Sequence, residues 1–173
     1  MMRSLGTPVF FFAALFAVTT AQAAAKQAVA VFDFELIDTS LDGEKNGPRA
    51  DEQQRIELIS NTLRSRLGAN DKFQVVDIAP VNAKAHAVHL QECGGCDADL
   101  AAKVGGTLSI TGTVQKVSNL ILNMSIYVRD VASGRVVAAM NADMRGNTDE
   151  SWSRTVDWLV RNRLLQALDG VQQ

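Results

Sequence analysis

The sequence predicts an α/β (α+β) domain built on a single mixed sheet, with elements in the order β-α-β-α-β-β-β-α. Apolar residues recur with a period of two in residues 28–36 and with a helical period in residues 51–67. Three alternating stretches then follow one another between residues 107 and 144, separated only by turn residues. An amphipathic stretch over residues 149–168 closes the chain. These observations favour a sheet that ends in an antiparallel meander and carries its helices on one face.

The first half of the chain predicts two strands and one long helix. Residues 28–36 form the first strand, which is apolar on both faces and is therefore expected near the centre of the sheet. Residues 51–67 form a helix that Gly68 ends. Residues 73–78 form a short second strand. Between the first strand and the helix, residues 38–51 predict a polar loop, the longest irregular stretch of the domain.

The second half predicts a helical region, three strands and a closing helix. Residues 82–90 are rich in alanine and can form a helix, and a second helix covers residues 97–104. The three strands share a pattern of apolar side chains on one face and polar side chains on the other. The polar face of the first of them carries Thr107, Ser109, Thr111 and Thr113 and is expected to be exposed to solvent.

The amino terminus has the pattern of a cleaved signal peptide. Arg3 precedes an apolar run over residues 5–18, and Ala21-Gln22-Ala23 is the small-x-small pattern that signal peptidase cleaves. The run is shorter than the roughly 20 apolar residues that a spanning helix needs. We therefore expect residues 1–23 to be removed and residues 24–173 to form one domain in the periplasm.

Composition argues against nucleic-acid binding. Without Arg3, 16 basic residues face 19 acidic residues, which gives the exported chain a net charge of −3. A nucleic-acid interface needs a clustered excess of Lys and Arg, and the sequence has none. No arrangement of nucleophile and base predicts catalysis, so we expect neither an enzyme nor a cofactor. Asp33 and Glu35 share a strand face and a carboxylate pair can do acid–base chemistry, but a solvated strand face or an N-cap partner is the preferred explanation.

Cys93 and Cys96 are the only cysteines and have the spacing Cys-x-x-Cys. The first interpretation is a structural disulfide, because disulfides persist in the compartments that exported proteins reach. The second is a redox-active dithiol at the start of the helix over residues 97–104. The third is a metal site that adds His86 and His89, the only histidines, to the two sulfurs.

Several segments resemble a known family. "AVFDF", "LISNTLRSRLG" and "KFQVVD" in the first half, with "CDADLAAKVGGTLSITGTVQKV" and "LILNMSIYVRDVASGRVV" in the second, resemble the TolB amino-terminal domain and the related domain of CsgG-type assembly proteins. The resemblance covers residues 28–168 and implies an envelope protein that works by contacting other proteins. It concerns structural motifs, so it carries over no functional residue.

Two hypotheses of function follow. The first is a non-enzymatic envelope protein that binds a partner protein through its sheet edge, its polar sheet face or the loop over residues 38–51. The alternative is a small redox or metal-handling protein that uses Cys93 and Cys96 with His86 and His89.

Overall fold

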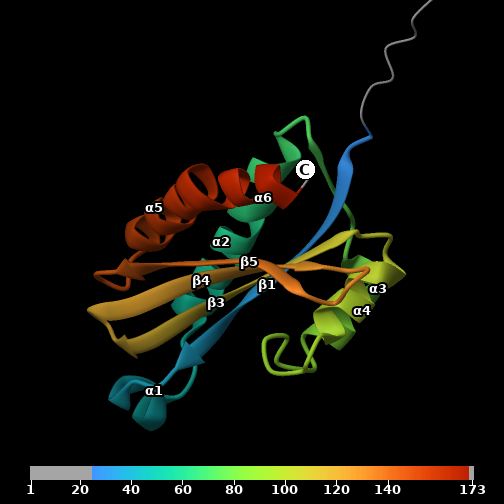
Figure 1. The fold of residues 1–173 in the computed structure, drawn as a ribbon. Helices are drawn as coiled ribbons and strands as arrows, with labels where there is room; N and C mark the ends of the chain where they lie inside the picture. Colours follow the sequence, from blue (N-terminus) through green and yellow to red (C-terminus); the bar gives the residue numbers. More distant parts are fainter. Residues whose placement is uncertain (1–24, 172–173) are drawn as a thin grey trace, which may run out of the picture.

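The computed structural model describes residues 25–171, and the expected signal peptide lies outside them. It confirms the predicted fold class, because one five-stranded mixed sheet is combined with helices (Figure 1). The strands are β1 (Gln27–Asp38), β2 (Phe73–Val75), β3 (Leu108–Ser118), β4 (Ile121–Asp130) and β5 (Val136–Met144). The helices are α1 (Leu41–Asn46), α2 (Ala50–Gly68), α3 (Ala79–Ala85), α4 (Cys96–Lys103), α5 (Asp149–Leu159) and α6 (Leu165–Val171), with a π-helical turn, Val160–Leu164, between the last two.

The sheet has the strand order β2-β1-β3-β4-β5. β1 pairs in parallel with β2 on one side and with β3 on the other. β3, β4 and β5 form the predicted antiparallel meander. β2 and β5 are therefore the outer strands, and they differ greatly in length.

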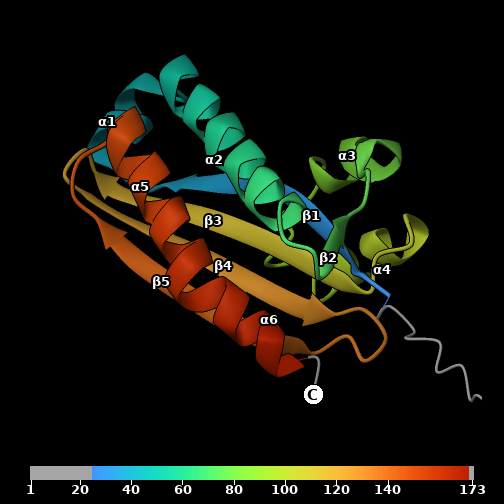
Figure 2. The ribbon, with the colours of Figure 1, turned by 90° about the horizontal axis from the view of Figure 1, so that it is seen from above.

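One face of the sheet is covered by α2 and by the continuous rod of α5 and α6. Figure 2 shows these helices side by side across the strands. They bury the main core, in which Trp152 and Leu159 of α5 and Ile59 and Leu63 of α2 lie over the sheet. An ion pair of 2.8 Å between Arg66 and Asp157 links the two helices at the surface. Burial of the apolar face of each helix supplies most of the free energy that holds this layer together.

A second and smaller helical layer lies on the other face of the sheet. α3 and α4 pack over β1, where Val81, Ala85 and Leu100 bury Ala30 and Phe32 in a separate apolar cluster. The sequence predicts helices on one face of the sheet, and α2, α5 and α6 follow that prediction. The additional layer has a clear cause: β1 is apolar on both faces, so both faces need cover.

β1 does not keep a strict alternation along its length. Its register against β3 shifts between Val31 and Phe34, which is the mark of a β-bulge. Ala30 and Phe32 point to the second cluster, whereas Phe34 points to the main core with Val29 and Val31. A strict period of two over residues 28–36 would place Phe32 and Phe34 on one face, but the extra residue at the bulge reverses the alternation after it.

The segment over residues 38–51, expected to be irregular, contains the short helix α1. The hydroxyl of Ser40 accepts a hydrogen bond from the Gly43 amide at 3.1 Å and caps this helix. Among the residues that the structure describes, no helix is both long and apolar enough to span a bilayer.

Candidate functional site

A hollow of the described surface follows an open edge of β1. β2 pairs with β1 only at Gln27, Ala28 and Val29, so in residues 25–171 no strand continues that edge as far as Asp38. A groove of about 680 Å³ lies beside this open stretch. Its floor is the second half of β1, and Figure 1 shows that half running towards α1.

Three segments form the walls of the groove. α2 contributes Gln53, Ile56 and Glu57 on one side. Residues 85–90, which begin at the last residue of α3, form the opposite wall, and Gly43 of α1 with Gly47 and Pro48 after it closes the groove. The sheet edge and the loop over residues 38–51, two of the surfaces that the sequence suggested for partner binding, therefore meet at one site.

The bulge in β1 is stabilised by side chains of α2. Arg64 Nε donates a hydrogen bond to the Val31 carbonyl oxygen at 3.1 Å. The Phe34 amide donates to Ser60 Oγ at 2.9 Å, and this hydroxyl donates in turn to the Ile56 carbonyl oxygen. The amide of Thr39 donates to Lys116 on β3. Since backbone groups alternate along a strand, the N–H and C=O of Leu36 point to the groove.

Asp33 lies at the mouth of the groove between two partners. Its carboxylate accepts from Arg64 Nη2 at 2.5 Å, and its other oxygen lies 2.8 Å from His86 Nε2. Burial raises the pKa of Asp33, but the hydrogen bond and charge of Arg64, with those of His86, outweigh burial and lower it. Asp33 is therefore ionised at neutral pH and holds His86 against the rim.

The groove has an acidic lining. Asp33, Glu35, Asp38 and Glu57 contribute carboxylates, and none of the described lining residues is Lys or Arg. Glu57 is exposed, whereas Asp33 and Asp38 are partly neutralised by cations behind them. Apolar side chains, among them Leu36 and Val88, lie between the polar ones. The lining therefore combines apolar contact with a local negative charge.

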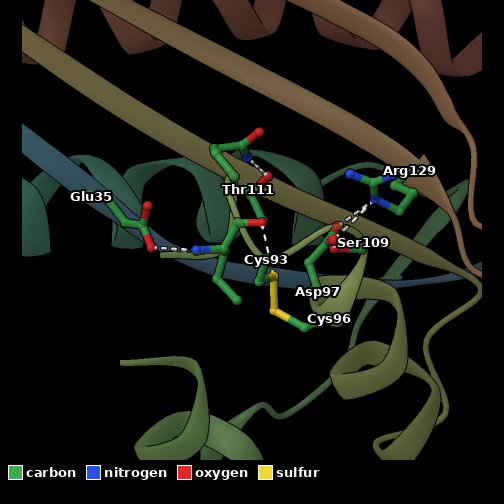
Figure 3. The surroundings of a disulfide bond; sticks show 9 residues. Glu35, Cys93, Cys96, Asp97, Ser109, Thr111 and Arg129 are labelled. Atoms are coloured by element: carbon green, nitrogen blue, oxygen red, sulfur yellow. Dashed lines mark hydrogen bonds and ion pairs between the residues drawn. A yellow bond between two sulfur atoms is a disulfide. The ribbon is translucent and has the colours of Figure 1, made fainter. Parts of the chain in front are cut away.

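The disulfide loop supports the wall opposite α2 (Figure 3). Cys93 and Cys96 form a disulfide with their Cα atoms 5.7 Å apart. Leu90, just before it, donates its amide to Glu35 Oε1 on β1 at 2.8 Å. Cys93 Sγ lies 3.3 Å from the Leu90 carbonyl oxygen, and Gln91 is hydrogen-bonded to Thr111 on β3. The disulfide thus closes a short loop whose other contacts attach the wall to the sheet.

The polar face of β3 is buried beneath this loop and α4. Ser109 donates to Asp97 Oδ2 at 2.9 Å, and Arg129 Nε lies 3.0 Å from both Asp97 oxygens (Figure 3). Thr111 and Thr113 are also buried. The expectation that this face is exposed to solvent is wrong for β3, because buried polar side chains are tolerated when each finds a hydrogen-bond partner.

The structure does not bring the four residues of the metal hypothesis together. The two cysteine sulfurs are bonded to each other, His86 contacts Asp33, and His89 is exposed. Within residues 25–171, no group of three or more His, Cys, Asp or Glu side chains is arranged to hold a metal ion. The redox and metal alternatives therefore gain no support from the geometry.

A buried ionic cluster at the end of the groove was missed by the sequence analysis. Lys116 and Glu52 are fully buried, and Lys116 Nζ lies 2.6 Å from Glu52 and 3.0 Å from Asp38. Asn147 donates to the same Glu52 oxygen at 2.6 Å. Two sequence signals could have found the pair: Glu52 extends the apolar stripe of α2 by one turn, and Lys116 continues the inward face of β3 after Val114.

The cluster shifts the ionisation of its members in opposite directions. Burial lowers the pKa of Lys116, but the hydrogen bonds and charges of Glu52 and Asp38 outweigh burial and raise it. Burial raises the pKa of Asp38, and its hydrogen bonds from Ser40 and Lys116 lower it overall. Both groups are therefore charged at neutral pH, and they tie the last residue of β1 to β3 and α2.

The protein-family model DUF3280, described as "Protein of unknown function (DUF2380)", matches residues 27–164. The chain belongs to this family. The match runs from the first residue of β1 to the end of the π-helical turn, so DUF3280 covers the sheet, the groove and the disulfide loop. No curated protein matches the sequence significantly.

Solved structures of low sequence identity also match. The LpoB C-terminal domain from Salmonella enterica has 15% identity and a TM-score of 0.48, with 74% of this chain and 89% of that chain covered. The PelC dodecamer from Paraburkholderia phytofirmans has 15% identity and a TM-score of 0.45, with coverage of 82% and 92%. TolB from Acinetobacter baumannii has 13% identity and a TM-score of 0.46, with coverage of 84% and 29%.

The resemblance to the TolB amino-terminal domain and to CsgG-type proteins therefore stays a prediction from the sequence. At these identities and TM-scores, no partner, activity or site residue carries over to this chain.

Proposed function

We propose that this DUF3280 protein is an exported, non-enzymatic accessory protein of the envelope that binds an extended segment of a partner protein in the β1 groove. The observation that carries the proposal is the open edge of β1 beside a groove of about 680 Å³. An extended peptide adds to an exposed sheet edge through main-chain hydrogen bonds, while side pockets give specificity. The groove offers both features.

The open edge sets the length of the segment that fits. The bulge uses the Val31 carbonyl and the Phe34 amide for contacts with α2, so a partner strand pairs beyond them, alongside Leu36. α1 ends the groove after Asp38. The partner therefore contributes a short strand of about three or four residues, since each residue of a strand advances about 3.3 Å.

The lining sets the chemistry of the segment. Its four carboxylates without a Lys or Arg favour a partner that carries basic side chains. Leu36 and Val88 favour apolar side chains at the positions between them. A segment that alternates apolar and basic residues meets both requirements, because side chains of a strand alternate between its two faces.

The remaining parts of the proposal concern export and the disulfide. Residues 1–23 act as the signal peptide, residues 24–173 form the single periplasmic domain, and the Cys93–Cys96 disulfide forms after export. Its role is structural: it fixes the loop that attaches Leu90 to Glu35 and so preserves the groove wall.

Two matched substitutions test the proposal. Val88 and Leu58 are apolar residues of similar exposure, 42% and 41%, but only Val88 lines the groove. Tagged protein is expressed in its native host and captured from envelope extract after brief cross-linking. Val88→Arg fills the groove and adds a cation, so it is expected to lose the partner that wild type captures, whereas Leu58→Arg retains it.

Capture of the same partner by Val88→Arg would refute the groove as the binding site. Loss of the partner by both variants, with unfolding curves unchanged, would indicate that the partner binds the surface of α2 that carries Leu58 and not the groove alone. The absence of any stoichiometric partner of wild type would contradict the proposed function itself.

A further inference from the structure

The two ends of the β1 groove differ. At the mouth, Asp33 contacts Arg64 of α2 and His86, which follows α3. At the other end, α1 and the turn after it close the groove beyond Asp38 (Figure 1). A segment paired with Leu36 can therefore continue freely past the mouth, whereas at the closed end it meets α1.

The closed end has more carboxylates than cations. Three carboxylates surround one buried ammonium group, Lys116 Nζ: Asp38 at 3.0 Å, Asp42 at 3.8 Å and Glu52 at 2.6 Å. Arg49 lies 3.7 Å from Asp42 and 3.9 Å from Glu52, but its closer ion pair, at 2.9 Å, joins it to a further carboxylate, Asp51. The cations of this cluster therefore do not balance its negative charge.

Two carboxylate oxygens of the same cluster have no hydrogen-bond donor. Within residues 25–171, Asp42 Oδ2 and Glu52 Oε2 are buried and accept no hydrogen bond, and the whole Glu52 side chain is buried. A buried acceptor without a donor costs free energy, and an ionised carboxylate can accept several hydrogen bonds. Asp38 is the member of the cluster that lines the groove. An occupant that brings a cationic donor to Asp38 is therefore favoured at the closed end.

The direction of a bound strand decides which of its groups reaches the closed end. Antiparallel pairs are slightly more stable per residue than parallel pairs. β1 runs from the mouth to the closed end, so an antiparallel segment has its amino-terminal side at the closed end. Because α1 prevents further extension there, the segment begins at this point with an α-amino group, whose ordinary pKa of about 7.7–8.0 makes it a cation at neutral pH. A parallel segment would instead bring its terminal carboxylate to Asp38, and like charges repel.

We infer that the β1 groove binds the free amino terminus of its partner, with the first residues antiparallel to β1 alongside Leu36 and the α-ammonium group beside Asp38. This inference rests on the proposed function of the groove and adds to it the end of the partner that binds and the direction of its strand. Proteins that lose a signal peptide on export have a free amino terminus, so the compartment expected for this chain supplies such partners.

Two peptide libraries displayed on phage test the inference separately from the proposed function. Both contain four random residues followed by the spacer Gly-Ser-Gly. In the first library the random residues begin at the free amino terminus, and in the second they follow the fixed segment Ala-Gly-Ser-Gly. Each library is selected on immobilised wild type and depleted on Val88→Arg, in which the groove is filled. Sequences are expected to be enriched from the first library only.

The other outcomes separate the two claims. Equal enrichment from both libraries, or enrichment from the second alone, would keep the groove as a peptide site but overturn the binding of an amino terminus. Failure to enrich a sequence from either library would contradict the proposed function and the inference with it.

The most enriched peptide, made by synthesis, tests the charge and the direction. Acetylation removes the charge of its amino group and is expected to raise the dissociation constant roughly fivefold or more, and a smaller change would overturn the role of that charge. A nitroxide label at the carboxyl end of the peptide is expected to broaden the amide signal of His86, at the mouth, more than that of Gln53, near α1. The reverse order would overturn the antiparallel direction.

Discussion

The two edges of the sheet differ in nearly every property that decides what can pair with them. The edge of β1 is bulged, its first open backbone groups are taken by Arg64 and Ser60, and a walled acidic groove follows. The edge of β5 is longer, bare and almost uncharged. The first edge can accept only a short segment of suitable charge, whereas the second accepts any strand that matches its length. One fold thus offers a selective edge and a permissive one.

The largest loss of stability is expected from removing Lys116, the lysine of the buried ionic cluster beside β1. Lys116→Met leaves the buried Glu52 and the half-buried Asp38 without their cation, and loss of one member of a buried ion pair costs about 3–5 kcal/mol of stability. Urea unfolding at pH 7 measures the loss. Lys103→Met, at an exposed position of α4, is the control and is expected to change stability by less than about 0.5 kcal/mol.

The same cluster gives a pH dependence of known sign. The pKa of Asp38 is lower in the folded chain than the unfolded value of about 3.9, so its contribution is present above that pH and is lost as the pH falls through the folded-state value. In Lys116→Met, the unfolding free energy is expected to fall less between pH 7 and pH 3 than it does in wild type. An equal fall in the two proteins would contradict the role of Lys116 in lowering the pKa of Asp38.

Overpacking at Gly112 is expected to have the next largest effect. A Cβ at this position of β3 would overlap the ring of Phe34, which lines the groove and cannot move into the packed core behind it. We expect Gly112→Ala to lower stability by about 3 kcal/mol, the upper end for overpacked cores, and to weaken partner binding. Gly68→Ala, whose Cβ has ordinary contact distances, is expected to be neutral or slightly stabilising. Equal effects of the two substitutions on urea unfolding would refute the contact with Phe34.

Loss of the disulfide is expected to cost about 2 kcal/mol, because the loop that it closes is short. Cys93→Ser/Cys96→Ser should also increase the exchange rate of the Leu90 amide, which donates to Glu35, and weaken partner binding. Amide hydrogen exchange checks the first effect, and unaltered protection of Leu90 would show that the disulfide does not support the groove wall.

The smallest effect is expected from a single charge at the rim. Glu57→Gln removes an exposed carboxylate of the groove and is expected to slow partner association roughly two- to fivefold at low salt, with no change in stability. Glu150→Gln, an exposed carboxylate on α5 outside the groove, should leave association unchanged. A Glu57→Gln effect that persists at high salt would indicate that the contact is not electrostatic.

The sequence was sufficient to predict the order of elements, the meander and the helical layer, because each depends on a local period of apolar residues. It also pointed to a sheet edge as one candidate surface. It could not show which part of that edge is open, since this depends on β2 ending at Val75 after three residues. The sequence also could not predict the bulge at Phe32 and Asp33. β1 has apolar side chains on both faces, so the change of face after the bulge leaves no visible break in the apolar pattern.

The buried charges were missed for a different reason. Lys116 and Glu52 lie on inward faces, but their burial is tolerated only because the fold brings them together across 64 positions of sequence. The same is true of Asp97, which meets Ser109 and Arg129 beneath the disulfide loop. Periodicity predicts which way a side chain points and says nothing about the distant residue that compensates its charge.

Site-specific photo-cross-linking tests the partner groove most directly. Gln53 and Gln54 are adjacent, exposed residues of α2, and only Gln53 lines the groove. A photoreactive residue at position 53 is expected to form a covalent adduct with one partner protein in cells of the native host, and Val88→Arg should abolish it. The same residue at position 54 should give little or none. Equal adducts from both positions, or an adduct at position 53 that survives Val88→Arg, would contradict the assignment of the β1 groove as the binding site.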